Sequence, residues 1–571
     1  MDTRVDLPVF ATQAESAETS AAPPLRHPSE ADPLWWRSAV IYQVYVRSFA
    51  DGDGDGIGDL AGVRANLPYL RDLGVDAIWF NPWYASPLAD GGYDVSDYRQ
   101  IHPAFGTLAD AEALISEALA LGLRTVIDVV PNHISDQHPW FQAALAAGPG
   151  SPERERFWFR PGAGPNGDEM PNHWVSHFSG DTWTRTTNPD GTAGEWYLHL
   201  FTPEQPDLNW NHPDVRREHE EILKFWFDRG VAGVRIDSAA LLVKDPALPE
   251  VPDEPGPGEH PTTDRDELHD IYRDWRAIAD SYPGTRVLVG EIWLPDSERF
   301  AKYLRADELH TAFNFDFLAR SWDAPGLRES INATLAAHAR VGAPSTWVLS
   351  NHDVTRPVTR YGREDSSFAF VTKRVGTPTD LELGTRRARA AALLSAALPG
   401  SLYIYQGDEL GLPEAEQLPT DRLQDPMHFR SGGVDPGRDG CRVPLPWRGI
   451  RVPFGFSPAD GSTQPWLPQP AEWASLTVEQ QQSDPSSMLW LYRQALRLRH
   501  REDGLGDGPF EWREGPADTL VFSRGKEFVT VTNLSTSPIE LPECAGILLT
   551  SSPLVDGLLP ADSTAWLRTA P

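Results

Sequence analysis

The chain has 571 residues, of which 50 are Lys or Arg and 82 are Asp or Glu, so its formal net charge is −32. A charge of this sign repels nucleic-acid phosphates and anionic lipid, which argues against nucleic acid or a membrane surface as a partner. The two cysteines, Cys441 and Cys544, make neither a disulfide framework nor a zinc site, and we find no apolar run long enough to span a bilayer. We expect a cytoplasmic protein, as a monomer or a homo-oligomer.

Residues 1–34 are rich in Ala, Ser, Glu and Pro without periodicity, which predicts a disordered leader. After Trp35, short β-branched or aromatic runs alternate with stretches of helical periodicity such as residues 108–121 and 215–227. This alternation is typical of βα units around a parallel sheet. The predicted strands are residues 40–46, 77–80, 124–130, 233–236, 286–291, 311–315, 346–350 and 401–405. Eight such units close into an α/β fold, the (β/α)8 TIM barrel.

Three connections are too long for simple loops of a barrel, and long loops in compact domains are usually functional. Residues 133–209, after the third strand, predict an inserted subdomain within a barrel formed by residues 35–132 and 210–507. A Pro- and acid-rich stretch follows the fourth strand at 244–266, and another long connection follows the eighth at 407–484. From residue 508 to 571, alternating segments such as 519–522 and 528–532 predict a C-terminal antiparallel β domain.

Acidic residues directly follow three of the predicted strands. The fourth ends in GVRID (233–237), the fifth in VGEIW (289–293) and the seventh in SNHD (350–353). In a barrel of this kind, chemistry collects at the carboxyl ends of the strands. One such acid alone is better explained as a cap or a salt bridge. Three at one rim, together with Arg235 and His352, favour a catalytic site.

These strand ends occur with DVVPNH at 128–133, QPDLNW at 205–210 and GRDGCRVPLPW at 437–447. As an ordered set they resemble the α-amylase superfamily of glycoside hydrolases, in its oligosaccharide-cleaving α-glucosidase branch. The resemblance covers nearly everything after Trp35. It implies a retaining exo-α-glucosidase that releases glucose from the non-reducing end of short α-1,4-linked gluco-oligosaccharides such as maltose. The reaction would pass through a covalent glucosyl-enzyme, with transglucosylation as a further outcome.

The resemblance assigns roles that the chemistry supports. Asp237 would be the nucleophile, Glu291 the general acid/base and Asp353 the group that stabilises the transition state. Retaining hydrolysis needs two carboxyl groups roughly 5 Å apart, which suits such a pair. We expect Arg235, two residues before Asp237, to keep that aspartate ionised and to lower its pKa. The resemblance adds these substrate-binding residues: Asp90, Tyr93, His133, Phe178, Phe201, His352 and Arg438.

Two further expectations concern specificity. Asp90 paired with Arg438 would grip the terminal glucose and close the pocket, which implies exo action. In the resembling enzymes the residue after the nucleophile is Val in α-1,6 specialists, so Ser238 argues for α-1,4 linkages. An α-1,6-glucosidase, a trehalose-forming isomerase and a sucrose hydrolase remain alternatives with the same nucleophile and acid. A catalytically silent transporter subunit is disfavoured, because it would lack the three acids and carry a membrane span.

Residues 51–59 (DGDGDGIGD) place acids at alternate positions with glycines between them, which suits oxygen ligation of a hard cation such as Ca²⁺. An EF-hand is excluded because its twelfth position is Gly62 and not Glu. The resemblance implies a structural calcium, with magnesium as the other candidate ion, and a solvated acidic turn as the alternative. The implied ligands are Asp51, Asp53, Asp55, the carbonyl of Ile57 and Asp59.

Overall fold

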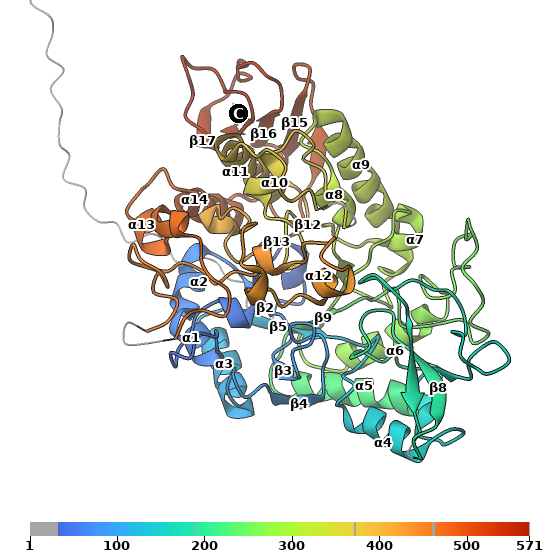
Figure 1. The fold of residues 1–571 in the computed structure, drawn as a ribbon. Helices are drawn as coiled ribbons and strands as arrows, with labels where there is room; N and C mark the ends of the chain where they lie inside the picture. Colours follow the sequence, from blue (N-terminus) through green and yellow to red (C-terminus); the bar gives the residue numbers. More distant parts are fainter. Residues whose placement is uncertain (1–31, 189, 371–372, 459–462, 570–571) are drawn as a thin grey trace, which may run out of the picture.

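The computed structural model describes residues 32–188, 190–370, 373–458 and 463–569. Except for residues 32–34, the predicted leader therefore lies outside the described residues. At the centre of the molecule is an eight-stranded sheet in which every neighbouring pair is parallel (Figure 1). Its strands are β1 (Val40–Val44), β2 (Ala77–Phe80), β5 (Arg124–Val129), β9 (Gly233–Ile236), β10 (Val287–Gly290), β11 (Thr311–Ala312), β12 (Thr346–Val348) and β13 (Ser401–Tyr405). All eight predicted strands are confirmed.

The sheet curves until its two edges meet. Its order is β11-β10-β9-β5-β2-β1-β13-β12, and the hydroxyl groups of Thr311 and Thr346, on the two edge strands, hydrogen-bond to each other. Every residue of these eight strands is buried, because the inner face is packed and helices cover the outer face. The predicted (β/α)8 barrel is confirmed.

Helices cover the outside of the barrel. Thr107 begins one of them with a capping box, in which its side chain and that of Asp110 satisfy each other's backbone amides. The helices predicted at 108–121 and 215–227 are confirmed as α3 and α5. The barrel helices are α1 (Leu60–Ala65), α2 (Leu67–Leu73), α3 (Leu108–Ala120), α5 (Pro213–Phe227), α6 (Leu268–Asp280), α7 (Ser297–Lys302), α8 (Phe315–Ala319), α9 (Ala324–Val341), α10 (Pro357–Tyr361), α11 (Leu381–Ala397) and α14 (Met488–Arg501).

Two local features differ from the predicted pattern. Strand β11 ends at Ala312, three residues early, because the Asn314 side chain accepts a hydrogen bond from the Phe317 amide and starts α8. A short antiparallel pair, β3 (Tyr84–Ala85) and β4 (Asp97–Ile101), follows β2 and was not predicted. It leads the chain past Asp90 and Tyr93.

The segment between β5 and α5 forms a small unit of its own. It contains a helix and a three-stranded antiparallel sheet in the order β6-β8-β7. Trp158, Trp174 and Trp183 are the largest side chains of its separate apolar cluster. The elements are α4 (Pro139–Ala147), β6 (Phe159–Arg160), β7 (Trp183–Thr187) and β8 (Ala193–Leu198).

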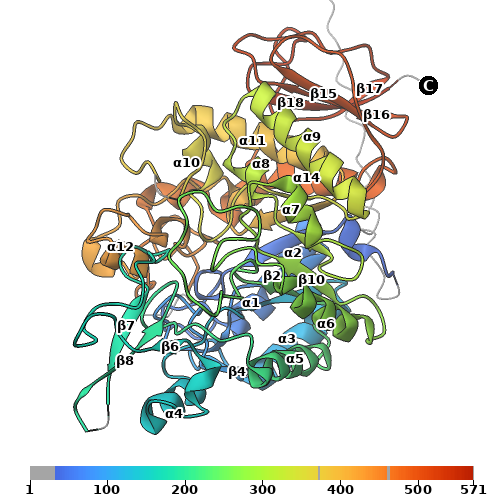
Figure 2. The ribbon, with the colours of Figure 1, turned by 90° about the vertical axis from the view of Figure 1, so that its right-hand side faces the viewer.

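The chain after the barrel forms a five-stranded antiparallel sheet in the order β14-β15-β16-β18-β17. It packs against α11, where Trp566 donates its indole N–H to the Leu393 carbonyl at 3.1 Å. In both views this sheet and the β6–β8 unit lie at opposite ends of the molecule (Figures 1 and 2). The strands are β14 (Phe510–Trp512), β15 (Thr519–Arg524), β16 (Phe528–Asn533), β17 (Gly546–Thr550) and β18 (Ser563–Arg568).

Candidate active site

A pocket of about 490 Å³ opens at the carboxyl ends of the barrel strands. Asp237 follows β9, Glu291 follows β10, and Asp353 lies in the loop after β12. All of the predicted catalytic and substrate-binding residues except Arg235 line this pocket, and so does Ser238. The structure therefore brings together residues that the sequence spreads from Asp90 to Arg438.

Arg235 lies behind the pocket wall, where one guanidinium group contacts three carboxylates. Its Nη1 donates to Asp237 Oδ1 and to Asp128 Oδ1, each at 2.7 Å, and its Nη2 lies 2.7 Å from Glu291 Oε2. The Arg235 side chain is only 1% exposed. A fixed cation thus holds the two proposed reacting carboxyl groups side by side.

The pKa of Asp237 differs from our expectation. Burial is the largest influence and raises it, Arg235 lowers it, and the nearby Glu291 and Asp128 raise it again, so that the net shift is upward. Burial also raises the pKa of Asp128, to about 6. Arg235 therefore lowers the pKa of Asp237 as expected, but burial and the two neighbouring carboxyl groups outweigh it. With three buried carboxyl groups around one cation, the cluster favours keeping a proton.

The pKa of Asp353 is shifted in the opposite direction to that of Asp237. Its Oδ1 accepts from Arg438 Nη1 at 3.1 Å and from Arg442 Nη2 at 2.9 Å. Burial raises the pKa of Asp353, but the adjacent His352 and the two arginines outweigh it, and the net pKa is well below the usual value. Because burial lowers the pKa of His352 and keeps it neutral, the arginines are the lasting source of this effect. Asp353 is thus held as an anion in the pocket wall.

Asp90 and Arg438 form an ion pair in the lining of the pocket. Arg438 Nη2 donates to Asp90 Oδ1 at 2.6 Å, and both side chains are buried. The same guanidinium makes a two-pronged contact with Asp425, from Nε at 2.7 Å and from Nη2 at 2.9 Å, and its carbon lies 4.6 Å from the centre of the Phe178 ring. Contacts with this many partners hold the Arg438 side chain in one orientation.

Aromatic rings line the pocket next to these acids. The Tyr93 and His352 rings are stacked with their centres 5.2 Å apart, and the Tyr93 hydroxyl donates to Asp128 at 2.9 Å. Phe201 packs against both Phe178 and His133. Burial lowers the pKa of His133 to about 3, so this ring is neutral, and its Nε2 lies 3.0 Å from the Tyr93 carbonyl oxygen. Flat aromatic faces of this kind suit a sugar ring.

Other residues of the pocket lining are apolar. They include Trp293, Phe370, Met427 and Leu241. Ser238 also lies here, with φ of 46°, and its amide donates to Glu291 Oε2 at 2.9 Å. A non-glycine residue in this backbone region is uncommon and marks a constrained position.

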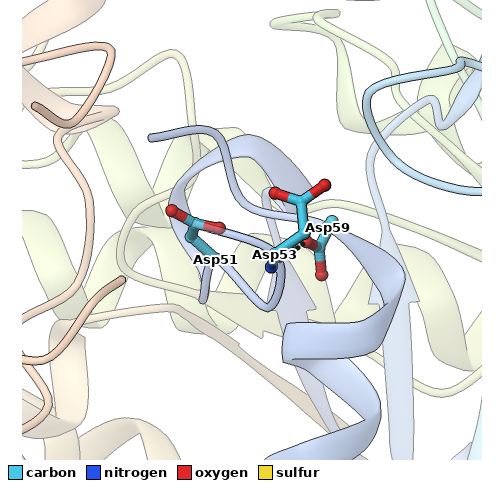
Figure 3. Close-up of side chains that lie close together, drawn as sticks. All are labelled: Asp51, Asp53 and Asp59. Atoms are coloured by element: carbon cyan, nitrogen blue, oxygen red, sulfur yellow. Dashed lines mark hydrogen bonds between the residues drawn. The ribbon is translucent and has the colours of Figure 1, made fainter. Parts of the chain in front are cut away.

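The acidic loop lies away from this pocket, immediately before α1 (Figure 3). Oxygen atoms of Asp51, Asp53 and Asp59 lie within 4.8 Å of one another. Among the described residues, no Lys or Arg forms an ion pair with these three, so their charge is not neutralised by a side chain. Asp55 instead accepts a hydrogen bond from the Ile57 amide at 2.8 Å, outside this cluster. The all-oxygen donor set fits a hard cation.

Comparison with known proteins identifies the family. The model for the α-amylase catalytic domain matches residues 43–508. The chain belongs to the α-amylase family.

Relatives within this family act on small glucosides. A probable α-glucosidase of Rhizobium meliloti is 37% identical over 518 residues, which cover 87% of this chain and 88% of the relative. An oligo-1,6-glucosidase of Parageobacillus thermoglucosidasius is 33% identical, over 84% and 86%. A crystal structure of an α-glucosyl transfer enzyme superposes with a TM-score of 0.81 and 33% identity, over 94% of this chain and 99% of that one. This α-amylase family member is a glycoside hydrolase.

The described part of this α-amylase family chain contains no helix that is both long enough and apolar enough to cross a membrane.

Several residues of the site were not predicted individually. Asp128, Trp293 and Arg442 lie within motifs that the sequence analysis quoted, and their position in those motifs was the available signal. Asp425 carried no such signal, because it lies outside those motifs and its role depends on its contact with Arg438.

Proposed function

We propose that this α-amylase family enzyme is a retaining exo-α-glucosidase that releases glucose from the non-reducing end of short α-1,4-linked gluco-oligosaccharides such as maltose. The observation that carries the proposal is the contact of one guanidinium, that of Arg235, with both Asp237 and Glu291. Retaining enzymes keep their two carboxyl groups about 5–5.5 Å apart, whereas inverting enzymes leave room for a water molecule between them. A shared cation favours the closer arrangement.

In the first half of the reaction, an Asp237 oxygen attacks the anomeric carbon while Glu291 protonates the leaving glycosidic oxygen. The product is a covalent glucosyl-enzyme. In the second half, Glu291 takes a proton from water as the water oxygen attacks the same carbon, and the bond from that carbon to Asp237 breaks, which frees the Asp237 carboxylate. An acceptor sugar hydroxyl in place of water would give transglucosylation. Asp353, held as an anion, would stabilise the positive charge that develops on the sugar ring.

The ion pair between Asp90 and Arg438 in the pocket lining supports exo action. In this proposal the pair ends the pocket, so that a terminal glucose would bind and a chain that continues beyond it would not. In this role the two charged groups would bind the hydroxyls of the terminal glucose, and charge-assisted hydrogen bonds of this kind are stronger than neutral ones.

The most detailed part of the proposal concerns which glycosidic linkage the enzyme prefers. Ser238 lines the pocket and its amide contacts Glu291, the proposed acid, so its side chain would lie near the leaving group. The small size of this side chain supports α-1,4 specificity. The similarity to an oligo-1,6-glucosidase supports α-1,6 specificity as the alternative. A trehalose-forming isomerase and a sucrose hydrolase would use the same pocket. Incubation with maltose, isomaltose, sucrose and trehalose in parallel, followed by separation of the products, distinguishes these activities.

We also propose that the loop around Asp51, Asp53 and Asp59 holds a structural Ca²⁺. The three clustered carboxylates support it, and Asp55 and the Ile57 carbonyl would complete the ligand set after a small rearrangement. The Asp59 side chain also accepts from the Gly62 amide at the start of α1, so the ion would stabilise the first helix of the barrel.

A further inference from the structure

Trp293 lies two residues after Glu291 and lines the same pocket. Its indole Nε1–H donates a hydrogen bond to Glu291 Oε1 at 3.1 Å. The indole stacks face to face on Phe315, with ring centres 3.8 Å apart and an angle of 4° between the planes. Phe370 contacts it edge-on at 4.6 Å. Two aromatic neighbours therefore fix the direction of the indole N–H.

The two oxygens of Glu291 have different surroundings. Oε2 lies 2.7 Å from Arg235 Nη2 and accepts from the Ser238 amide at 2.9 Å, so a cation and a backbone donor occupy it. Trp293 is the donor to Oε1. A proton is least compatible with Oε2, because two donors already point at that oxygen. The proton that reaches the substrate is therefore carried by Oε1.

From this geometry we propose that Trp293 is a positioning residue for proton transfer, which aims Glu291 Oε1 at the glycosidic oxygen. The inference rests on the proposed function, in which Glu291 is the acid/base. The last torsion of a glutamate side chain is broad, so a carboxyl group held at one oxygen only can still rotate. The bond from Trp293 removes this freedom, and proton transfer depends on such alignment.

The indole proton itself is not transferred. In the first half of the reaction, the O–H bond at Oε1 breaks and its proton moves to the glycosidic oxygen as the bond from that oxygen to the anomeric carbon breaks. In the second half, a water O–H bond breaks and its proton returns to Oε1, while the water oxygen bonds to the anomeric carbon and the bond from that carbon to Asp237 breaks. Throughout, Trp293 keeps Oε1 directed at the oxygen that gains or loses the proton.

The test is the variant Trp293→Phe, which retains a ring to stack on Phe315 and removes the N–H. Its kcat/KM is measured for maltose and for aryl α-glucosides whose leaving phenols range from acidic to weakly acidic. General acid–base transfer contributes about 10²–10⁴-fold to rates, so we expect a loss of about 10- to 100-fold for maltose and the poorest leaving groups. A nitrophenyl α-glucoside, whose leaving group needs no proton, should lose no more than about threefold.

A pH profile adds a readout that a merely structural role would not move. Removing a donor to the carboxylate favours the protonated acid, so the alkaline limb of kcat/KM for maltose should move to higher pH in Trp293→Phe. The matched control is Trp322→Phe, which removes an indole hydrogen bond of 2.8 Å to Asp562, outside the pocket. It should leave both the leaving-group dependence and the pH profile unchanged.

Phe315→Leu is a second variant, which keeps the indole N–H and removes the stacking ring. We expect the same leaving-group dependence from it, at smaller amplitude. Equal losses for all leaving groups in both variants, or no loss at all, would overturn the proposal. If the unmodified enzyme releases no glucose from any of these substrates, the proposed function fails instead, so the two failures are distinguishable.

Discussion

Asp90 and Arg438 are 348 residues apart in the sequence, yet Arg438 Nη2 donates to Asp90 Oδ1 in the lining of the pocket at 2.6 Å. Asp90 lies in the loop between β3 and β4, near the start of the barrel, and Arg438 lies in the long loop after its last strand. Closure of the barrel is what makes these two loops neighbours. The ion pair in the pocket lining thus depends on the whole fold and not on any one segment.

Asp90→Asn should weaken the binding of the terminal glucose. The amide keeps the shape of the side chain but loses its charge, and hydrogen bonds to charged groups contribute about 1.5–3 kcal/mol. We expect kcat/KM for maltose to fall about 10- to 100-fold, mostly through a higher KM. Steady-state kinetics measure this, with Glu117→Gln, which removes an exposed ion pair with Arg64, as the control. Unchanged kinetics in Asp90→Asn would contradict the assigned role.

Asp237→Asn and Glu291→Gln should each remove most of the activity on maltose, for different reasons. The first loses covalent attack and the second loses protonation of the leaving group. With an activated aryl α-glucoside, the Glu291 variant should still form and accumulate a glucosyl-enzyme, which mass spectrometry of the intact protein detects. The Asp237 variant should form none. Rapid hydrolysis by Asp237→Asn would show that another residue is the nucleophile.

The acidic side of the pH profile should reflect the raised pKa of Asp237. The nucleophile must be ionised to attack, and burial raises its pKa above the usual value of about 3.9 for an aspartate. As the pH falls through this raised pKa, kcat/KM should fall as well, and it should do so well above pH 4. A profile of kcat/KM against pH in the free enzyme reports this group. An acidic limb near pH 4 would mean that Arg235 outweighs burial.

Removal of divalent metal should lower the melting temperature more than it changes the catalytic rate at low temperature. A ligand that binds only the native state stabilises it by about 2.7 kcal/mol when present at 100 times its Kd. We expect the melting temperature to rise with added Ca²⁺ after chelation and to respond much less in Asp53→Asn. Calorimetry and elemental analysis measure the two effects. If chelation leaves the melting curve unmoved and no calcium is bound, the loop is an acidic turn.

Maltose should be cleaved faster than isomaltose, and Ser238→Val should shift the ratio of the two kcat/KM values toward isomaltose. A methyl-sized change in a pocket is worth about 1–3 kcal/mol, so the shift is a ratio and not a block. Because Ser238 has φ of 46°, a β-branched residue also strains the backbone there. Ser238→Thr is the matched control, since it is branched in the same way and keeps the hydroxyl. A wild-type preference for isomaltose would contradict the linkage assignment.

The barrel could be predicted from sequence because its strands are short apolar runs that end in polar residues. Asp237, Glu291 and Asp353 were identifiable for the same reason, since each follows such a run. The end of β11 was not predictable from apolar character, because Asn314 stops the strand by capping a helix within a run that remains apolar. Side-chain hydrogen bonding, and not hydrophobicity, decides that boundary.

The residues that form the site were easier to predict from sequence than the pKa shifts within it. The sequence shows that Arg235 is two residues from Asp237, which suggests a lowered pKa. It does not show that Asp128 and Glu291 contact the same guanidinium, or how deeply all of them are buried. These two facts reverse the direction of the shift. In the same way, the partnership of Trp293 with Glu291 depends on the stacking of Trp293 on Phe315, which has no signature in sequence spacing.

The C-terminal sheet donates to several backbone carbonyls of α11: Thr564 to Ala390, Trp566 to Leu393, and Arg524 to Ala397. Helix α11 leads directly into β13, the barrel strand that pairs with both β1 and β12. Without the sheet, these three carbonyl groups would hydrogen-bond to water instead, and the alanine-rich face of the helix would be exposed. We therefore expect the barrel and the terminal sheet to melt together in a single calorimetric transition, and a chain cut near residue 508 to be unable to keep its active site.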